Sequence, residues 1–442
     1  MSFETFPTPR QITFDARNHD LDNNQNFTRD GEWLIYDTRN PGIDSSQAIE
    51  KVHIKTGETV VLYGTAKGGE GPVAGAGAAS FSPKDDRVAF IHGPWKRTGL
   101  PYDFTRRRGG LVRGEDGGGF AFADARDITP PFTPGALRGG THRHEWDGSG
   151  QWLGYTYNDD VMKKQGQDLR TIGVTRLGHP VQVENAQDHL FEGSGEGFSA
   201  LVVAVTPDPK PGSDEIQRAA QDSWVGLEGY LRADGKSQLA RAFVGSCKSK
   251  SGEVLDEVFI VDIPADITQP GPLGPLEGTE TSFPAPPAGC AQKRLTHTGD
   301  RPLPGVAGTC WSSPDGEWIT FLAGDDSGMQ QIFAIDPEGK HLHQVTALPE
   351  GVACSPRWTA DGKWLAAVSK QGQLFVCAAP GQPGALQTAK AFFLTPACPS
   401  EKAPLKPIWS PDGKQIAYNQ PVNLEGKDYA QVFVVDVPPL TK

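Results

Sequence analysis

Two histidines separated by one residue, His142 and His144, stand at the predicted start of a β-strand. Side chains alternate along a strand with a period of two, so both imidazoles are expected on the same side. Neutral imidazole is the commonest protein ligand for transition metals. Joined by one or two further histidines or carboxylates, the pair predicts an open site for a divalent metal such as Mn, Zn or Ca. The alternative is a surface pair without metal.

Three further side chains are candidates for proton transfer because they fall near the ends of predicted strands. His19 precedes the first sequence repeat, His92 ends a predicted strand, and Tyr102 follows it. Binding and catalytic groups often lie on loops held by a rigid scaffold, and imidazole is the commonest general base. We expect His19 or His92 to act as the base, and Tyr102 to stack on a sugar or to supply a proton. His189, between two repeats, is a further candidate.

A basic run and two adjacent acids provide candidate substrate-binding groups. Arg106 and Arg107 belong to a run of three arginines, and Arg39 lies in an earlier loop. A guanidinium group binds carboxylate or phosphate with bidentate geometry, so these arginines are expected to hold an anionic group of a small ligand. Asp159 and Asp160 end another predicted strand and are expected to contact substrate. The alternative interpretation of the basic run is a solvated loop.

The sequence lacks the signatures of several other chemistries. No glycine-rich turn between a strand and a helix is present, so we expect no nucleotide or flavin cofactor. The segment 193–197 has glycine at its centre, where a nucleophile elbow requires serine. This argues against a serine peptidase.

The strands that position these residues are recognised by a short sequence pattern that recurs along the chain, which we call the repeated phrase. It consists of an aromatic residue, a turn rich in Ser, Thr, Pro, Asp and Gly, and then a short apolar run. The copies span 27–36, 81–90, 311–321, 358–366 and 409–418. A repeated hairpin unit indicates radial repetition of small sheets, which is the architecture of a β-propeller.

The pattern predicts one all-β domain over 1–442, a seven-bladed propeller with four-stranded antiparallel blades. Residues 10–14 resemble a fourth strand without a preceding blade, so we expect them to complete the last blade and remove an exposed edge. In the fourth blade we expect 200–205 to form a strand, 211–221 to contain a short helix capped by Ser213, and 264–288 to form a surface loop. The predicted blades are 20–65, 72–130, 140–186, 195–297, 305–347, 350–396, and 402–438 with 10–14.

Composition narrows the partners and the compartment. The 442 residues carry a formal net charge of −12, which argues against nucleic acid and against an anionic membrane surface as partners. Six cysteines without a CxxC pair are typical of buried free thiols in a reducing compartment. The N-terminus lacks a basic region followed by an apolar run, which indicates a cytoplasmic location, with a removed signal peptide as the alternative.

The repeats resemble those of the TolB and WD40-like propeller superfamily, a likeness that concerns the fold. A closer resemblance, to the YidR-like family of uncharacterised propellers, covers nearly the whole chain. The segments that carry it are 11–14 with 17–19, 90–94, 102–104, 133–140, 211–216, and 278–281 with 284–287.

A more distant resemblance concerns function. The segment Thr141-His142-Arg143-His144 is similar to a Thr-His-Pro-His segment of oligogalacturonate lyases, which are seven-bladed propellers that hold a divalent metal and cleave uronic-acid chains by β-elimination. The resemblance implies that His142 and His144 are metal ligands. The glutamine ligand of that family falls on Gly139 here, and His189 is the candidate replacement.

Taken together, these observations favour a carbohydrate-active enzyme that performs metal-assisted β-elimination on a small acidic sugar. A metal or an arginine would neutralise the uronate carboxylate, and a base would remove the adjacent proton. One alternative is a glycoside hydrolase that uses rim carboxylates such as Asp22, Asp159 or Asp160. The other is a non-catalytic TolB-like scaffold that binds a protein partner through an exposed apolar patch.

Overall fold

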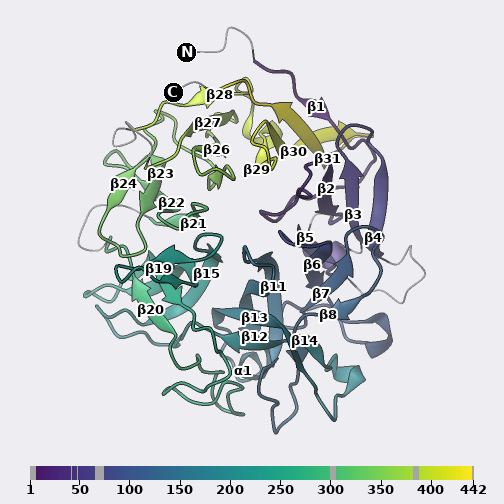
Figure 1. The fold of residues 1–442 in the computed structure, drawn as a ribbon, viewed down its shortest axis with the longest axis vertical. Helices are drawn as coiled ribbons and strands as arrows, with labels where there is room; N and C mark the ends of the chain where they lie inside the picture. The colour runs from purple at the N-terminus through teal and green to yellow at the C-terminus, as the bar shows by residue number, and fades with distance from the viewer. Residues whose placement is uncertain are drawn as a thin grey trace.

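The computed structural model describes residues 6–40, 42–46, 48–64, 74–298, 305–381 and 388–440. They form seven antiparallel sheets arranged radially around one axis, with the first and last described segments on the same side of the ring (Figure 1). Six of these sheets have four strands and one has three. The predicted all-β, seven-bladed propeller is therefore confirmed.

Each blade runs from an inner strand beside the axis to an outer strand at the rim. In chain order the blades are β2 (Trp33–Asp37), β3 (Ala48–His53), β4 (Thr59–Gly64); β5 (Gly77–Phe81), β6 (Arg87–His92), β7 (Arg108–Arg113), β8 (Ala121–Phe122); β11 (Gly139–Trp146), β12 (Trp152–Asp159), β13 (Arg170–Val181), β14 (Gly195–Leu201); β15 (Ile216–Trp224), β18 (Ala240–Lys248), β19 (Val254–Asp262), β20 (Ala291–Arg294); β21 (Ala307–Ser312), β22 (Ile319–Gly324), β23 (Gln330–Ile335), β24 (Leu342–Gln344); β25 (Arg357–Trp358), β26 (Trp364–Val368), β27 (Leu374–Ala378), β28 (Phe392–Phe393); and β29 (Leu405–Trp409), β30 (Gln415–Leu424), β31 (Lys427–Asp436) with β1 (Arg10–Gln11).

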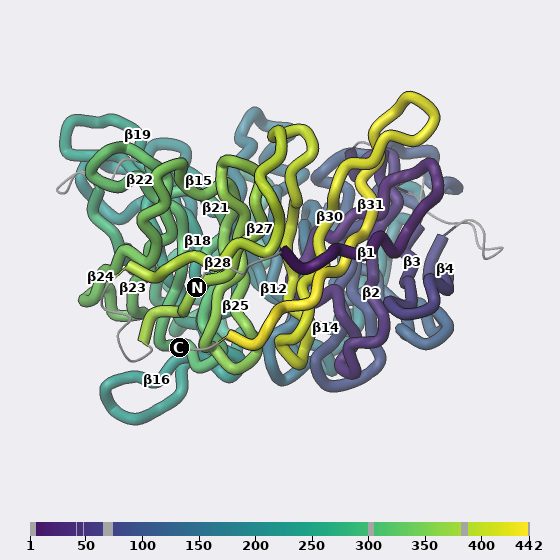
Figure 2. The backbone as a smooth tube through the Cα atoms, turned by 90° about the horizontal axis from the view of Figure 1, so that it is seen from above, coloured from purple at the N-terminus to yellow at the C-terminus, as the bar shows by residue number. Residues whose placement is uncertain are grey.

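The N-terminal strand closes the ring as predicted. β1 pairs antiparallel with β31, with Arg10 opposite Val434 and Gln11 opposite Phe433. In the first blade, isolated bridges from Asp20 to Asp37 and from Phe27 to Leu34 take the place of a regular inner strand. Purple β1 lies along yellow β31 in the side view (Figure 2).

The aromatic residue of the repeated phrase joins neighbouring blades. Four indole nitrogens donate to a backbone carbonyl of the preceding blade, over 2.9–3.3 Å. The pairs are Trp146 with Ser80, Trp224 with Glu145, Trp358 with Trp311, and Trp409 with Arg357. The phrase is therefore a structural unit of the ring, which is why it reports the fold and leaves the activity open.

Five inner strands contain a bulge at the same place in the repeat, three residues before the aromatic residue. There the backbone is left-handed, with φ between 52° and 74°, at Ala78, Arg143, Gln221, Gly308 and Lys406. A bulge adds one residue to one strand and redirects the side chains around it.

The boundary between the third and fourth blades differs from the prediction. β14 (Gly195–Leu201) is the outer strand of the third blade, and the predicted helix at 211–221 is wrong because β15 begins at Ile216. Ser213 Oγ bonds to the Lys210 carbonyl oxygen and does not cap a helix. Ile216, Ala219 and Trp224 pack into a core with Phe243 and Phe259, and this burial outweighs the local helix signal.

The remaining elements are short. They are α1 (Asp160–Lys163); the 3₁₀ turns η1 (Ile43–Ser45), η3 (Lys96–Thr98), η4 (Asp188–Leu190) and η5 (Ser400–Lys402); the parallel pair β9 (Ala125–Arg126) and β10 (Ala136–Leu137); and the hairpin β16 (Tyr230–Leu231) and β17 (Ser237–Gln238). None of the helices in the described part of the chain is long and apolar enough to cross a membrane. All six cysteines are free, and Cys247, Cys310 and Cys377 are buried.

The disc has an upper and a lower face. The upper face carries the loops that join the second and third strands of each blade, and the tip of the β30–β31 hairpin rises from it (Figure 2, top). The lower face carries the connections between the first and second strands. The β16–β17 hairpin projects from it (Figure 2, bottom).

Candidate functional site

A pocket on the upper face opens between the third and fourth blades and has a volume of about 390 Å³. We call it the arginine pocket. Its two arginines come from the start of β13 and from β15, and an aromatic ring comes from the loop after β6. It is lined by Phe104, Asn158, Asp168, Leu169, Arg170, Gln217 and Arg218.

A chain of hydrogen bonds leads from this pocket toward the interior. Arg107 Nη1 lies 2.6 Å from His142 Nδ1, and His142 Nε2 lies 3.1 Å from Asn158 Oδ1. Arg170 Nε donates to the same Asn158 oxygen, and Asn158 Nδ2 donates to Asp168. Because a guanidinium group only donates, His142 Nδ1 must accept, so the proton of the neutral ring is on Nε2. Each bond in the chain then has one donor and one acceptor.

The site has an excess of positive charge despite the acidic composition of the chain. Burial, followed by Arg107 and Arg170, lowers the pKa of His142 well below its ordinary value. Burial, with repulsion from Arg218 and Arg107, lowers the pKa of Arg170 to about 10. Within the described part of the chain, Asp168 is the only carboxylate that lines the pocket. Such an arrangement attracts an anion, since each positive group is destabilised by its neighbours.

Tyr102 and Arg107 adjoin one another deeper in this region. The Arg107 guanidinium lies 5.1 Å from the centre of the Tyr102 ring. Among the described residues, neither the Tyr102 hydroxyl nor Arg107 Nε has a well-aligned hydrogen-bond partner. Burial raises the pKa of Tyr102, so its phenol is protonated and available as a proton donor. The structure therefore brings together Tyr102, Arg107 and His142 from the predicted set.

The same geometry does not fit a divalent metal at His142 and His144. Arg107 occupies His142 Nδ1, and a left-handed residue, Arg143 (φ 54°), separates the two histidines at the strand bulge. The Nε2 atom of His144 instead lies 3.0 Å from Thr141 Oγ1. A Cβ atom at Gly139 would lie 2.0 Å from the Asn158 carbonyl oxygen, so no glutamine fits there.

His189, the candidate replacement ligand, is exposed on η4. In the described ranges of the chain, no three His, Cys, Asp or Glu residues form a group that could hold a metal ion. The expected pairing of the two histidines on one strand face fails because the bulge breaks the alternation of side chains.

The two histidines proposed as bases are packed away from the pocket. His92 Nδ1 faces the Gly93 carbonyl oxygen, and Nε2 lies 2.6 Å from the Tyr63 hydroxyl. Burial lowers the pKa of His92 to about 3. His19 is 1% exposed, and its Nε2 lies 2.7 Å from Asp15 Oδ1. Neither His19 nor His92 lines the arginine pocket, so the structure does not bring these two candidates to it.

The remaining candidates are engaged in ion pairs or local bonds. Arg39 bonds to Asp37 and pairs with Asp22 at 3.0 Å, and Lys406 also pairs with Asp22. Arg106 Nη1 donates to the Pro101 carbonyl oxygen.

The two adjacent acids are likewise occupied. The Asp159 carboxylate pairs with Arg138 at 3.0 Å and accepts the Met162 amide hydrogen bond that caps α1. The Asp160 carboxylate accepts a hydrogen bond from the Thr105 hydroxyl and pairs with Lys164. This leaves no free pair among the carboxylates named for the hydrolase alternative.

Sequence reasoning missed Arg170 and Arg218. Arg170 opens β13, and Arg218 lies in the segment expected to be helical. Correct strand boundaries in the fourth blade would have brought both to the same inter-blade pocket.

Fold and site together define a seven-bladed propeller with a basic pocket on its upper face. Among solved structures, an oligogalacturonate lyase in complex with manganese is 13% identical with a TM-score of 0.56, covering 99% of this chain and 95% of that one. An oligogalacturonate lyase from Vibrio parahaemolyticus is 10% identical with a TM-score of 0.55 and the same coverage. At these identities the likeness defines the fold.

The family follows from the sequence comparison. The chain is 37% identical over 424 residues to "Uncharacterized protein YidR" of Escherichia coli (strain K12), covering 92% of this chain and 94% of that protein. Residues 75–190 match the family described as "Protein of unknown function (DUF3748)". The chain therefore belongs to the YidR family, and residues 75–190 include Arg107, His142 and Arg170.

Proposed function

We propose that the protein binds a carboxylate-bearing sugar in the arginine pocket and cleaves it by metal-independent β-elimination. The observation that carries the proposal is the hydrogen-bonded chain Arg107–His142–Asn158–Arg170, which ends at a basic pocket. The likeness in fold to oligogalacturonate lyases supports the reaction class.

The proposed roles follow from the positions of the side chains. Arg170 and Arg218 bind the uronate carboxylate, which acidifies the adjacent C–H as a metal would. The arriving carboxylate also draws Arg107 away from His142 Nδ1. The negative charge then offsets the arginines that depress the pKa of His142, so the ring becomes a stronger base when substrate is bound.

The step balances with groups present in the site. His142 Nδ1 takes the proton next to the carboxylate, the freed electron pair forms the carbon–carbon double bond, and the glycosidic oxygen leaves. Tyr102 donates a proton to the leaving oxygen, since its raised pKa keeps the phenol protonated. The products are a saturated sugar end and an unsaturated uronate.

The test uses oligogalacturonate, oligoglucuronate and alginate oligomers as probes and follows the ultraviolet absorbance of the unsaturated product. At least one probe should give product, and excess EDTA should leave the rate unchanged. His142→Gln and Arg170→Gln should each reduce kcat/KM at least a hundredfold. Arg176→Gln, on the same strand as Arg170 but with its guanidinium at the Ala265 carbonyl, is the matched control and should retain activity.

Three results would contradict the proposal. Absence of product with every uronate, with binding retained, would favour the non-catalytic scaffold. Loss of activity in EDTA would show that the reaction depends on a metal ion. Full activity of folded His142→Gln would remove the assigned base.

A further inference from the structure

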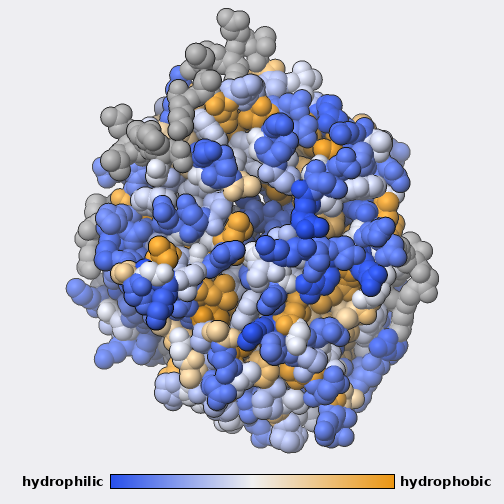
Figure 3. Space-filling view, in the orientation of Figure 1, coloured by the Kyte–Doolittle hydropathy of each residue, from blue (hydrophilic) through white to orange (hydrophobic). Residues whose placement is uncertain are grey.

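A second pocket opens at the centre of the lower face, on the opposite side of the disc from the arginine pocket. Its volume is about 360 Å³, and a small hollow is visible at the centre of the disc in the space-filling view (Figure 3). The aromatic residues of all seven blades line it: Phe27, Phe81, Trp146, Trp224, Trp311, Trp358 and Trp409. This is ample space for a small organic ligand with an apolar part.

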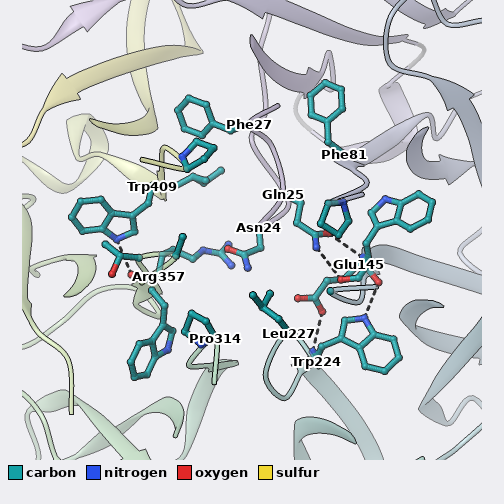
Figure 4. Close-up of a pocket in the computed structure, with 18 of the residues that line it drawn as sticks. Asn24, Gln25, Phe27, Phe81, Glu145, Trp224, Leu227, Pro314, Arg357 and Trp409 are labelled. Carbon is teal, nitrogen blue, oxygen red and sulfur yellow. Dashed lines mark hydrogen bonds between the residues drawn. The ribbon is translucent and has the colours of Figure 1, made fainter. Parts of the chain in front are cut away.

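Two opposite charges project into this pocket from different blades. Arg357 and Glu145 each stand immediately before the repeat aromatic, and Figure 4 shows both side chains directed toward the middle of the cavity. The other blades have uncharged residues at this position, namely Asn26, Ser80, Ser223, Cys310 and Ile408. The two charges are thus specific to this chain's third and sixth blades and are not required by the repeat.

Arg357 is incompletely satisfied by the protein. Its guanidinium carbon lies 3.7 Å from the centre of the Trp311 ring. Nη1 has no hydrogen-bond partner among the described residues, and no carboxylate in those residues forms an ion pair with Arg357. An enclosed guanidinium without an anion is costly, so the position is suited to receive one.

Glu145 provides the complementary charge. Its side chain is buried, 5% exposed, and one oxygen is engaged by the protein: Oε2 pairs with Arg241 at 3.1 Å and accepts from the Trp224 amide. The carboxylate is turned into the cavity (Figure 4), which leaves Oε1 available to a ligand cation. Leu227 and Pro314 border the same space and offer apolar contact.

We propose that this lower pocket binds a small zwitterion, an α-amino acid with an apolar or aromatic side chain. The ligand carboxylate pairs with Arg357, its ammonium group pairs with Glu145, and its side chain packs against the surrounding rings and Leu227. The site is independent of the arginine pocket and of the reaction proposed there.

The test measures binding of L-phenylalanine and L-leucine to the full chain by calorimetry and by the fluorescence of the tryptophans that line the pocket. 3-Phenylpropionate and phenethylamine are compared because each lacks one of the two charges. The amino acids should bind at least tenfold more tightly than either analogue. Binding should weaken at least tenfold in Arg357→Gln and in Glu145→Gln.

Arg176→Gln is the matched control and should bind within twofold of the wild type. Arg176 lies outside this pocket, and its guanidinium bonds to the Ala265 carbonyl oxygen. Melting temperature and circular dichroism report whether each variant folds. If Arg357→Gln does not fold, Arg357→Lys, which retains the charge, should bind between the wild type and Glu145→Gln.

The proposal is overturned if neither amino acid binds, if the one-charge analogues bind as tightly, or if folded Arg357→Gln and Glu145→Gln bind like the wild type. Uronate probes added to the same variants separate the two sites. Arg357→Gln should leave their binding at the arginine pocket unchanged.

Discussion

Three buried histidines set the response of the native state to acid at the level of single residues. Burial lowers the pKa of His92 and of His144 to about 3, and burial together with the charge of Arg107 lowers that of His142 well below its ordinary value. In the unfolded chain each would bind a proton near pH 6.5. Below that pH the unfolded state therefore binds more protons than the native state, and stability falls as the solution is acidified.

Replacing His92 with phenylalanine should make the protein less sensitive to acid. Between roughly pH 6 and pH 4 the slope of unfolding free energy against pH should decrease by nearly one proton, or about 1.4 kcal/mol per pH unit. Urea unfolding at several pH values measures this slope. His189→Phe is the control, since the exposed His189 is solvated in both states.

The slope difference isolates one side chain from opposing effects elsewhere. Burial raises the pKa of Asp124 to about 6, which stabilises the native state as pH falls and partly hides the histidines in the wild type. Because Asp124 is present in both proteins, its contribution cancels in the comparison. An unchanged slope in His92→Phe would mean that His92 is charged in the native state.

At the level of the strand and its turns, the sequence predicts conformations that particular residue types prefer. It does not predict conformations that are imposed by packing between strands. Gly31, Gly316, Gly362 and Gly413 have φ between 69° and 76°, so the Asp-Gly turns could be recognised directly. The inner-strand bulges could not, because Ala78, Arg143, Gln221 and Lys406 have no preference for the left-handed backbone that they adopt there.

The candidate site was only partly accessible to prediction for the same reason. Arg107 and His142 were found because their residue types suggest chemistry. Their direct contact depends on the bulge at Arg143, which also turns His144 away. Arg170 and Arg218 come together only because the third and fourth blades lie side by side. The sequence did not predict this, because the segment 211–221 resembles a helix, whereas strand β15 begins within it at Ile216.

The bulge predicts different effects for neighbouring glycine substitutions. Ala78 and Ala79 are both buried, and of the two only Ala78 has a left-handed backbone (φ 53°). Ala78→Gly should change stability by less than about 1 kcal/mol, because relief of the left-handed strain offsets the loss of a buried methyl group and the added freedom of the unfolded chain. Ala79→Gly should lower stability by about 1–2 kcal/mol, since it loses a buried methyl group and relieves no strain. Urea unfolding measures the stability of the two variants, and equal losses of unfolding free energy would contradict the strain assigned to the bulge.

At the scale of the whole molecule, ring closure connects the two ends of the chain. The β1–β31 pairing is continued by Ile12, whose amide donates to the Val432 carbonyl oxygen. The Ile12 side chain packs with Val432 and Val434, in a cluster that also includes Leu21 and Phe27 of the first blade. The latch thus covers the edge of β31 and joins the last blade to the first.

Removal of residues 1–14 should therefore destabilise the entire propeller and leave the edge of β31 exposed. We expect a loss of about 3 kcal/mol or more from the buried Ile12 and the lost ladder, together with self-association through β31. Urea unfolding and size-exclusion chromatography measure the two effects. A synthetic peptide spanning 6–17, added in excess, should restore both the unfolding midpoint and the elution volume of the intact chain, because it supplies the missing strand. Phe14→Ser in the intact chain is the control: Phe14 is 66% exposed, so its loss should be nearly neutral. A truncated chain as stable as the intact one would show that the other six blades hold the ring closed without the latch.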